Sequence, residues 1–539
     1  MAVDPGKWLA PLFGAMAKGD FAAARPLLKD ALRHIPKDPR VQAVRLDLPL
    51  MEGGQVLGGA GPLMEADGAV MDAAYDAAAT AMTSPFAAPP TRRMAAKVLM
   101  QLGGSAEVER LGDFAKVGRD WAAAGRHDVL LQQMPRVKSH ADRVELVEQH
   151  RIAARLYETK AASEPIRPPP PRPARPRPRI GFLSADLRAH VVGSFALPLF
   201  ENADPNAADL ICYSTYRGPV DHIGQLIRAK SMVREIGHLP DQAAAQVIAD
   251  DGLDVLIDLG GSTGDNRLGV MAYRTAPVAI SWMGYPHSTG LSSVDYILLD
   301  RALAPQSADL LAEKPLLMPN AWICMARVQF SQARAPNPVP PQERTGAVTF
   351  GTANQAVKYS PAALAAWART VAATPGSSLL IFRPECASSR FRDNVARAFA
   401  AHGVERERLR FEAVRGAGYL DHYDAVDVSL DTFPLTGGTT TCESLWMGVP
   451  VVTLAGEAVF ERLSHSILTH AGLSDLSVAD EAAFVAKAVE LAGDVERLRR
   501  LRRELRAQIA ASPLGDGPGF ARDFFRVMAE VRPPNGEGA

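Results

Sequence analysis

Residues 431–446, DTFPLTGGTTTCESLW, combine residue types that can hold an anion at the start of a helix. A short apolar run, 426–430, leads into this stretch, and an apolar, helix-compatible stretch follows it. The pattern predicts a strand that ends near Asp431 and a helix that begins near Thr440. The first backbone N–H groups of a helix have no intrahelical partner, and the helix dipole is positive there. Such a helix start favours a phosphate or another anion.

The small and polar residues of the turn suit a phosphate and a ribose. Glycines at two positions would let a phosphate reach the backbone, and three threonines would add hydroxyl donors: Gly437, Gly438, Thr439, Thr440 and Thr441. Glu443 follows one turn into the helix, where its carboxylate could accept two ribose hydroxyls. A structural interpretation competes, because Thr440-x-x-Glu443 has the pattern of a capping box, which alone would explain both residues. The residues by themselves leave both interpretations open.

This turn belongs to the second of two series in which strands alternate with helices. A segment rich in Pro, Gln and Ala, 331–345, separates the two series. Alternating strands and helices predict doubly wound α/β domains, whose ligands bind at the carboxyl ends of the strands. The predicted strands are 179–185, 209–215, 254–261, 278–286 and 294–300 in the first series, and 347–352, 378–384, 408–414, 427–431 and 449–456 in the second. Amphipathic helices are predicted over 494–512 and 520–531, the last leaning back on the first series.

Before the first series, the pattern is helical. Residues 5–38 match one tetratricopeptide unit: Trp8 opens one helix, Gly19-Asp20-Phe21 form the turn, and Pro36 ends the second helix. Two later amphipathic segments, 94–104 and 142–162, extend the helical pattern without clean repeat signatures. Because single repeat units cannot bury their apolar faces, we predict a degenerate helical solenoid. Its concave face would bind a protein partner; the alternative is that these helices only pack on the catalytic part.

A proline- and arginine-rich stretch, EPIRPPPPRPARPRPRI, marks the clearest boundary. Proline excludes a helix or a central strand there, so an extended, semi-rigid linker is predicted. The domain prediction is therefore a helical domain, a linker and two successive α/β domains: 1–163, 164–178, 179–340 and 341–539.

Composition excludes several classes of function. The formal net charge is −1, so no global field would attract nucleic acid or a membrane surface. The four cysteines are far apart and form no CxxC pair, which argues against a disulfide framework or a zinc site and fits a reducing cytoplasm. The sequence shows neither a secretory signal nor an apolar run of about 18 residues, so a cytoplasmic protein is expected.

Five segments, in order along the chain, resemble the O-GlcNAc transferase family of GT-B glycosyltransferases. The resemblance covers about 179–532, and the tetratricopeptide-like start also fits that family. The five segments are RIGFLSADLRAHVVGS (179–194), SWMGYPHSTGLSSVDYILLD (281–300), FGTANQAVKYSP (350–361), AAWARTVAATPGSSLLIFRP (365–384) and DTFPLTGGTTTCESLWMGVPVVTLAGE (431–457). The resemblance implies a GT-B fold, two Rossmann-like domains, behind an all-α helical domain.

The resemblance assigns roles on the donor side. It implies that Lys358 touches the donor phosphates, where one cation would stabilise the charge that develops as the glycosidic bond breaks. Gln355 would hydrogen-bond near the nucleotide, and Tyr419 would stack on its base. The threonines after Gly438 would hold phosphate, and Glu443 would hold the ribose.

On the acceptor side, the resemblance implies a role for the loop after the first strand. His190 titrates near neutral pH and would accept a hydroxyl proton or position the acceptor. Asp186 would either orient His190 or cap the next helix. Tyr285 and Pro286 would shape the acceptor wall and carry no chemistry.

Two departures from the family pattern bear on the substrate. The donor turn of the family carries a histidine where this chain has Gly438, and that histidine helps to bind a diphosphate. Another family histidine has no counterpart, because Val233 occupies the aligned place. A CMP-linked sugar has one phosphate and needs fewer donors. The absence of a DxD motif in the cleft segments fits metal-independent chemistry, so no metal cofactor is expected.

The sequence therefore predicts an inverting protein O-glycosyltransferase. Its donor would be a CMP-nonulosonic acid such as pseudaminic acid, and its acceptor would be flagellin, recruited by the helical domain. This prediction follows the resemblance to bacterial flagellin glycosyltransferases with a tetratricopeptide-like start. Two alternatives stay open: a UDP-sugar enzyme of the GlcNAc type that modifies other cytosolic proteins, and a non-catalytic scaffold that binds a partner through its helices.

Overall fold

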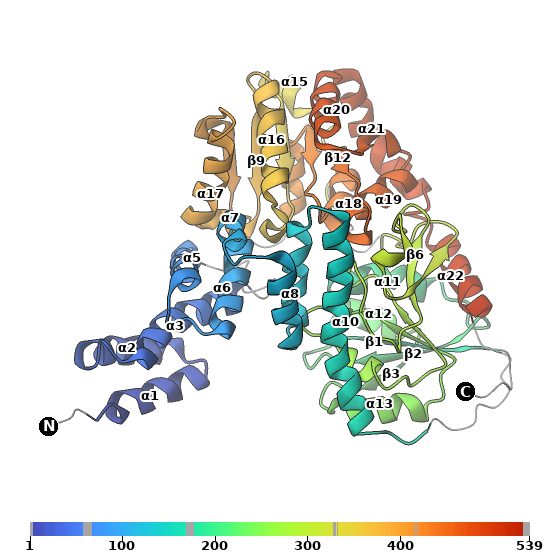
Figure 1. Ribbon diagram of the computed structural model, residues 1–539. Helices are drawn as coiled ribbons and strands as arrows, with labels where there is room; N and C mark the ends of the chain where they lie inside the picture. The colour runs from blue at the N-terminus through green and yellow to red at the C-terminus, as the bar shows by residue number, and fades with distance from the viewer. Residues whose placement is uncertain are drawn as a thin grey trace. The chain divides into compact units, whose positions relative to one another are not determined.

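The computed structural model describes residues 4–57, 67–168, 177–326, 330, 333–414 and 418–531 of the 539 (Figure 1). The chain forms two compact units. The first unit comprises Met1–Gly112 and Thr349–His422, and the second comprises Asp113–Val348 and Tyr423–Ala539. Much of the predicted linker, 169–176, lies outside the described residues, as do residues 331 and 332 of the predicted boundary segment.

The second unit contains a seven-stranded parallel sheet with the strand order β3-β2-β1-β4-β5-β6-β7. The order reverses between β1 and β4, where Ile180 pairs with Val255. Sheets of this doubly wound type bind ligands outside the carboxyl ends of the strands at such a switch point. The strands are β1 Arg179–Ser184, β2 Asp209–Ser214, β3 Met232–Glu235, β4 Val255–Asp258, β5 Val278–Ser281, β6 Tyr296–Asp300 and β7 Lys314–Met318.

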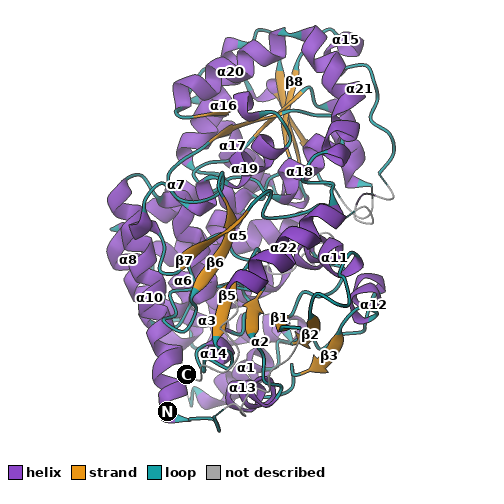
Figure 2. Cartoon of the chain, turned by 90° about the vertical axis from the view of Figure 1, so that its right-hand side faces the viewer, coloured by secondary structure: helices purple, strands orange, loops and turns teal. Residues whose placement is uncertain are grey.

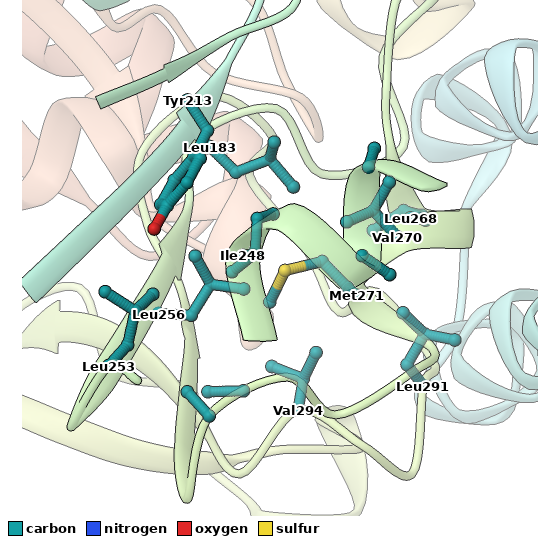
Figure 3. Close-up of a cluster of buried hydrophobic side chains, with 14 of the residues drawn as sticks. Leu183, Tyr213, Ile248, Leu253, Leu256, Leu268, Val270, Met271, Leu291 and Val294 are labelled. Carbon is teal, nitrogen blue, oxygen red and sulfur yellow. The ribbon is translucent and has the colours of Figure 1, made fainter. Parts of the chain in front are cut away.

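Helices cover both faces of this sheet, and apolar residues fill the layers between them (Figure 2). Figure 3 shows one such layer, where Leu183 of β1, Leu256 of β4 and Ile248 meet. The helices of this part are α11 Val191–Glu201, α12 His222–Arg228, α13 Asp241–Asp250 and α14 Leu268–Met271. The short helix α15 Pro341–Thr345 contacts the C-terminal part of the unit instead, where Glu343 pairs with Arg499.

The helices α8 Phe114–Ala123, α9 His127–Leu130 and α10 His140–Ser163 also belong to the second unit. A full capping box begins α10: Ser139 accepts from the backbone of Asp142, whose side chain accepts from the backbone of Ser139. Ala154 of α10 belongs to the same buried cluster as Leu183 and Leu256. The helix therefore packs directly on the α/β part of this unit.

The second unit also contains strands β11 Val428–Leu430, β12 Val451–Leu454 and β13 Ser477–Val478, which run parallel in that order. Their helices are α18 Thr439–Trp446, α19 Leu463–His470, α20 Glu481–Gly493, α21 Val495–Ala511 and α22 Gly517–Val531. The last helix packs on the seven-stranded sheet, because Phe524 of α22 contacts Phe182 of β1 and Trp282. This confirms that the chain end leans back on the first α/β series.

The first unit begins with a helix pair in the tetratricopeptide register. Gly19, at a φ of 69°, forms the turn between α1 and α2, and Asp20 caps α2 by accepting from the backbone N–H of Ala23. Leu12, Ala24 and the other apolar residues of these helices form one buried cluster with α3. The N-terminal helices are α1 Gly6–Ala17, α2 Phe21–His34, α3 Pro39–Leu57, α5 Gly68–Thr83, α6 Pro89–Gln101 and α7 Ser105–Glu109.

The rest of the first unit holds three parallel strands, in the order β10-β9-β8, and their helices. The N-terminal helices pack on this part: Asp72 of α5 accepts from the Ser388 and Ser389 hydroxyls, and Tyr75 donates to Asn394. The elements are β8 Thr349–Thr352, β9 Ser378–Phe382, β10 Leu409–Glu412, α16 Pro361–Ala373 and α17 Ser389–Ala400.

These elements confirm the predicted fold class, two parallel Rossmann-like sheets behind a helical start. Sequence analysis did not find three strands, β3, β7 and β13, because they lack a buried apolar run; the residues of β3, for example, are mostly exposed. The predicted domain boundaries stay predictions, while the chain passes from one compact unit to the other after Gly112, Val348 and His422.

Candidate functional site

Helix α18 begins at Thr439, one residue before the predicted start, and its N-cap is Gly438. Thr440 therefore lies inside the first turn and cannot be the N-cap of a capping box with Glu443. Gly438 has no side chain with which to cap the helix, and no side-chain cap hydrogen bond is formed there. The geometry removes the structural alternative for Thr440 and keeps a helix start of the kind that binds anions.

The turn before α18 is organised around the buried carboxylate of Asp431. One oxygen accepts from the backbone N–H of Thr432 at 2.9 Å and of Gly437 at 2.8 Å. The other oxygen accepts from the hydroxyl of Thr453 on β12 at 2.6 Å. Charge-assisted hydrogen bonds of this length are strong, so Asp431 fixes where the chain enters the helix.

The two glycines of the turn differ in the space around them. A Cβ atom at Gly437 would lie 2.5 Å from the Thr441 hydroxyl and 2.8 Å from the Asp431 carboxylate. At Gly438 the nearest atom would be a methyl of Leu463 at 4.0 Å, so a Cβ atom there meets no close neighbour. Packing alone requires Gly437, whereas the fold would accept a side chain at position 438.

The threonines of the turn lie in different environments. Thr441 is buried and shares a hydrogen bond of 2.7 Å with Ser464, which in turn donates to the Gly437 carbonyl. Thr439 and Thr440 are half-buried, and the Thr440 carbonyl accepts from the Tyr423 hydroxyl. Thr441 is thus part of the scaffold of the turn, and Glu443 is buried beside it at 5% exposure.

On the acceptor side, His190 is the N-cap of α11. Its Nδ1 accepts from the backbone N–H of Val192 at 3.3 Å, so the cap is His190, and Asp186 does not cap this helix. The Asp186 carboxylate lies 3.5 Å from the same Nδ1 and accepts from Arg188 at 3.2 Å. Nδ1 cannot both accept from the Val192 N–H and carry a proton toward Asp186, and only the tautomer with the proton on Nδ1 leaves Nε2 to accept a proton.

Burial lowers the pKa of His190 below its ordinary value of 6.5. The carboxylates of Asp186 and Asp265 oppose this shift, and Arg188 adds to it. His190 is therefore neutral near pH 7, which a proton acceptor must be. Its place on the loop after β1, at the switch point of the sheet, is where a ligand is expected.

Tyr285 is buried and bound to α10. Its hydroxyl lies 2.8 Å from Nε2 of His150, whose Nδ1 lies 2.8 Å from the Leu146 carbonyl. Burial raises the pKa of Tyr285, so it stays protonated. Pro286 beside it is half-buried. The role assigned to Tyr285 and Pro286 in shaping the acceptor wall stays a prediction.

One buried apolar cluster joins the predicted acceptor wall to the turn before α18. Tyr285 of the seven-stranded part and Leu435, two residues before Gly437, lie in the same cluster as Leu146 of α10 and Phe460. Thr436 is held to this cluster because its backbone N–H and its hydroxyl both donate to the Phe460 carbonyl. The second unit therefore brings two predicted site segments together.

Salt bridges hold α10 against the segment before α19. Arg143 donates two hydrogen bonds to Glu461, at 2.6 and 2.7 Å, and His140 bridges Glu457 and Asp309. Glu461 is nearly fully buried and also accepts from two backbone N–H groups. A bidentate, buried arginine pair of this kind positions the segment rigidly.

Three of the predicted donor residues belong to the first unit. Gln355 precedes the 3-10 helix Ala356–Lys358, where the Lys358 backbone N–H donates to the Gln355 carbonyl. The loop is anchored by the fully buried Tyr359, whose hydroxyl donates to the Asn354 carbonyl. Tyr419 is the first residue of the 3-10 helix Tyr419–Ala425. The roles assigned to Gln355, Lys358 and Tyr419 stay predictions.

Sequence analysis missed a set of aspartates that end strands. Asp258 ends β4 and accepts from Gly260 and Gly261, and burial raises its pKa to about 6. Asp300 ends β6 and accepts from Ser466, Leu303 and Trp322. Asp431 directly follows β11. An Asp directly after an apolar run is the signal that would have found them, because a carboxylate there can accept from the N–H groups of the next loop.

Among the residues that the structure describes, no cluster of three or more His, Cys, Asp or Glu could hold a metal ion. The same residues include no helix that is both long and apolar enough to cross a membrane.

Comparison with known proteins identifies the family to which these features belong. The family described as "Glycosyl transferase family 41" matches residues 162–333 and 340–524. The match covers both α/β series and includes Asp186, His190, Lys358 and the turn before α18.

Two curated relatives come from plants. The chain is 35% identical over 356 residues to a probable UDP-N-acetylglucosamine–peptide N-acetylglucosaminyltransferase SPINDLY of Oryza sativa subsp. japonica. It is 34% identical over 354 residues to the protein of the same name from Arabidopsis thaliana. Each alignment covers 64% of this chain, but only 37% and 38% of those relatives.

A solved structure resembles nearly the whole chain. It is a mutant of the Thermobaculum terrenum O-GlcNAc transferase, 25% identical, with a TM-score of 0.73. The likeness covers 98% of this chain and 99% of the solved one. The helical start is thus part of the shared architecture.

Proposed function

The chain belongs to glycosyl transferase family 41, and from this membership we propose that it is a protein O-glycosyltransferase that takes its sugar from a nucleotide donor. The names of its plant relatives and of the similar solved enzyme support this proposal. The observation that carries it is the buried cluster of Tyr285 and Leu435, which joins the acceptor-side wall to the turn at the start of α18.

In the proposed reaction, a serine or threonine hydroxyl of the acceptor attacks the anomeric carbon of the sugar. The bond from that carbon to the donor phosphate breaks, and the nucleotide leaves with the electron pair. The N–H groups at the start of α18 and the Lys358 ammonium stabilise the charge on the departing phosphate. The hydroxyl proton goes to His190, which its lowered pKa keeps neutral. Attack from the face opposite the leaving group inverts the anomeric configuration.

For the donor, we propose a UDP-linked N-acetylhexosamine. The names of the relatives favour this donor over a CMP-linked nonulosonic acid. The second candidate, a CMP-nonulosonic acid, is favoured by one specific observation: position 438 lacks the family histidine that helps to bind a diphosphate. Because the fold leaves room for a side chain at Gly438, the missing histidine is not a packing requirement.

Titration calorimetry with UDP and CMP would distinguish the two donors. The UDP proposal expects the wild-type chain to bind UDP more tightly than CMP. Gly438→His should then tighten UDP binding by about tenfold, because the new side chain adds one charge-assisted hydrogen bond to the diphosphate. The affinity for CMP should not change. Gly438→Ala is the matched control, because it fills the same space without a donor. Tighter binding of CMP by the wild type would reject the UDP proposal.

The transfer itself is tested by mass spectrometry of an acceptor protein. We propose flagellin as the first acceptor to examine, with other proteins as the alternative, and the N-terminal helices as the surface that recruits it. Purified chain, flagellin and either UDP-GlcNAc or a CMP-nonulosonic acid would be incubated, and the added sugar mass recorded. Lys358→Ala should reduce the rate by about 10²–10³-fold, while the exposed Lys230→Ala should not. Failure to add sugar from any donor, to any protein, would favour a non-catalytic scaffold.

A further inference from the structure

A cavity of about 280 Å³ lies on the acceptor side of the second unit. It is formed by the loops that follow β1, β2 and β3, together with α12, which can be located in Figure 2. Arg188 contributes from the first loop, Tyr216 and Arg217 from the second, and His238 from the third. Loops at the carboxyl ends of parallel strands are where doubly wound sheets bind ligands.

Most of the charges around the cavity are already compensated. Arg228 pairs with Glu235, and Arg188 donates to Asp186. The Asp221 carboxylate accepts from the backbone N–H groups of Ala189, at 2.6 Å, and Gly224, at 2.9 Å. These charged groups therefore have partners within the protein, and the Asp221 carboxylate keeps its negative charge.

Arg217 is the exception. Its Nε donates to the Gly237 carbonyl at 2.7 Å, which ties the guanidinium to the loop after β3. Within the part of the chain that the structure describes, no carboxylate oxygen lies within 4.0 Å of the Arg217 side-chain nitrogens. The cavity thus presents one uncompensated cation with terminal N–H groups that can bind a carboxylate in bidentate geometry.

An aromatic wall stands beside this cation. The Arg188 guanidinium lies over the Tyr216 ring at 4.7 Å, and the ring itself is exposed to 37%. A Cβ atom at Gly218 would lie 2.2 Å from the Tyr216 hydroxyl, so glycine at this position lets the ring lie close over the loop. The wall is therefore built by the local chain and is open to solvent on one side.

The cavity connects directly to the loop of the candidate proton acceptor. Arg188 lines it, and His190 is two residues further on. The backbone N–H of Ala189, between them, is bonded to Asp221 in the cavity wall. A group held here would be fixed relative to His190. The volume lies just below the range of about 300–1,000 Å³ for small-molecule sites, which suits a single side chain better than a nucleotide.

We propose that this cavity binds the carboxylate of an Asp or Glu side chain near the hydroxyl that receives the sugar in the acceptor polypeptide. The inference rests on the proposed function. One uncompensated guanidinium matches a monoanion, whereas a phosphate dianion would face the carboxylates of Asp221 and Glu235. The cavity would then select acceptors whose serine or threonine lies close to an acidic residue.

The first test measures binding without sugar transfer. Fluorescent peptides with a central serine, in which each flanking position in turn carries Glu or Gln, are titrated with the full chain by anisotropy. At one or two positions, the Glu peptide should bind about tenfold more tightly than the Gln peptide. Added salt should reduce this preference. Arg217→Gln should abolish it, and the exposed Arg500→Gln on α21 should keep it.

The outcomes separate this inference from the proposed function. Equal affinity for Glu and Gln peptides at every position would overturn the proposal that the cavity binds an acceptor carboxylate. A preference for Glu that survives in Arg217→Gln would overturn it too. A Glu preference without transfer from any nucleotide sugar would keep the cavity and reject the transferase.

A second arm tests the donor sugar as the source of the carboxylate. Arg217→Gln should raise KM for Glu peptides with UDP-GlcNAc, whose sugar is neutral, and leave kcat unchanged. If the variant instead impairs transfer only of a nonulosonic acid and leaves peptide preference intact, the cavity belongs to the donor sugar and the inference is wrong. Circular dichroism melting of each variant confirms that it is folded.

Discussion

The turn before α18 and the loop after β1 both follow a parallel strand and lead into a helix, yet they are built differently. The turn is held by a buried carboxylate, Asp431, which accepts three hydrogen bonds from the chain itself. The loop carries Asp186, Arg188 and His190, whose charged groups are partly open to solvent. The difference indicates that the turn is a rigid support, whereas the loop can respond to what binds beside it.

Removing the carboxylate from the turn should have the largest effect. Asp431→Ala leaves two backbone N–H groups and the Thr453 hydroxyl without their acceptor in a buried place. We expect a loss of about 4 kcal/mol in the free energy of unfolding, because hydrogen bonds to a charged group are involved. Urea denaturation measures it. A loss below about 1 kcal/mol would show that the turn does not depend on Asp431.

The two glycines sharpen the comparison within the turn. Gly437→Ala forces a Cβ atom to within 2.5 Å of Thr441 and should cost about 2–3 kcal/mol. Gly438→Ala meets only open space and should change stability by less than about 0.5 kcal/mol. Thermal melting of the two variants side by side provides the measurement. Equal stabilities would contradict the packing requirement at position 437.

Two buried histidines should make the folded chain less stable at low pH. Burial lowers the pKa of His150 to about 3, and it lowers the pKa of His287 well below 6.5. Below pH 6.5 these two histidines become protonated in the unfolded chain but stay neutral in the folded chain. Protonation therefore favours the unfolded chain, and stability is lost as the pH falls. Each ring contributes about 1.4 kcal/mol per pH unit, or about 2 kcal/mol by pH 5.

His287→Leu tests this contribution, because neither ring nitrogen of His287 has a hydrogen-bond partner among the described residues. Between about pH 4 and 6, the free energy of unfolding of the variant should depend less steeply on pH, by the equivalent of one proton taken up on unfolding. Denaturation at several pH values measures the slope. The exposed His222→Gln is the control and should keep the wild-type slope. An unchanged slope in His287→Leu would mean that folding does not lower the pKa of His287.

The smallest effect is expected in the loop after β1. Asp186→Asn removes a carboxylate that raises the pKa of His190, so that pKa should fall further below 6.5. Because the pair is partly exposed, the change in stability should stay below about 1 kcal/mol. Nuclear magnetic resonance titration of the His190 ring follows the shift. A rise of its pKa would show that Asp186 does not act on the ring through its charge.

Much of the fold could be predicted from local patterns. Apolar runs between helical stretches located most strands, and the residues around Gly19 located the first helix pair. The exposed strand β3 was missed, because an edge strand need not be apolar. Within the candidate site, glycines and threonines indicated the turn, but the sequence did not reveal the role of Asp431 or the cavity beside Arg217.

By itself, the sequence determined the types of elements and the turn that starts α18, because propensity, periodicity and helix-start residues act over a few neighbouring positions. Only the tertiary structure decided that position 438 has room, since the nearest atom there would be a methyl of Leu463 on α19. It also joined Tyr285 to Leu435 and placed Arg217 against the loop after β3. Those contacts link residues far apart in the chain. Local sequence patterns depend only on neighbouring residues, so they cannot predict such contacts.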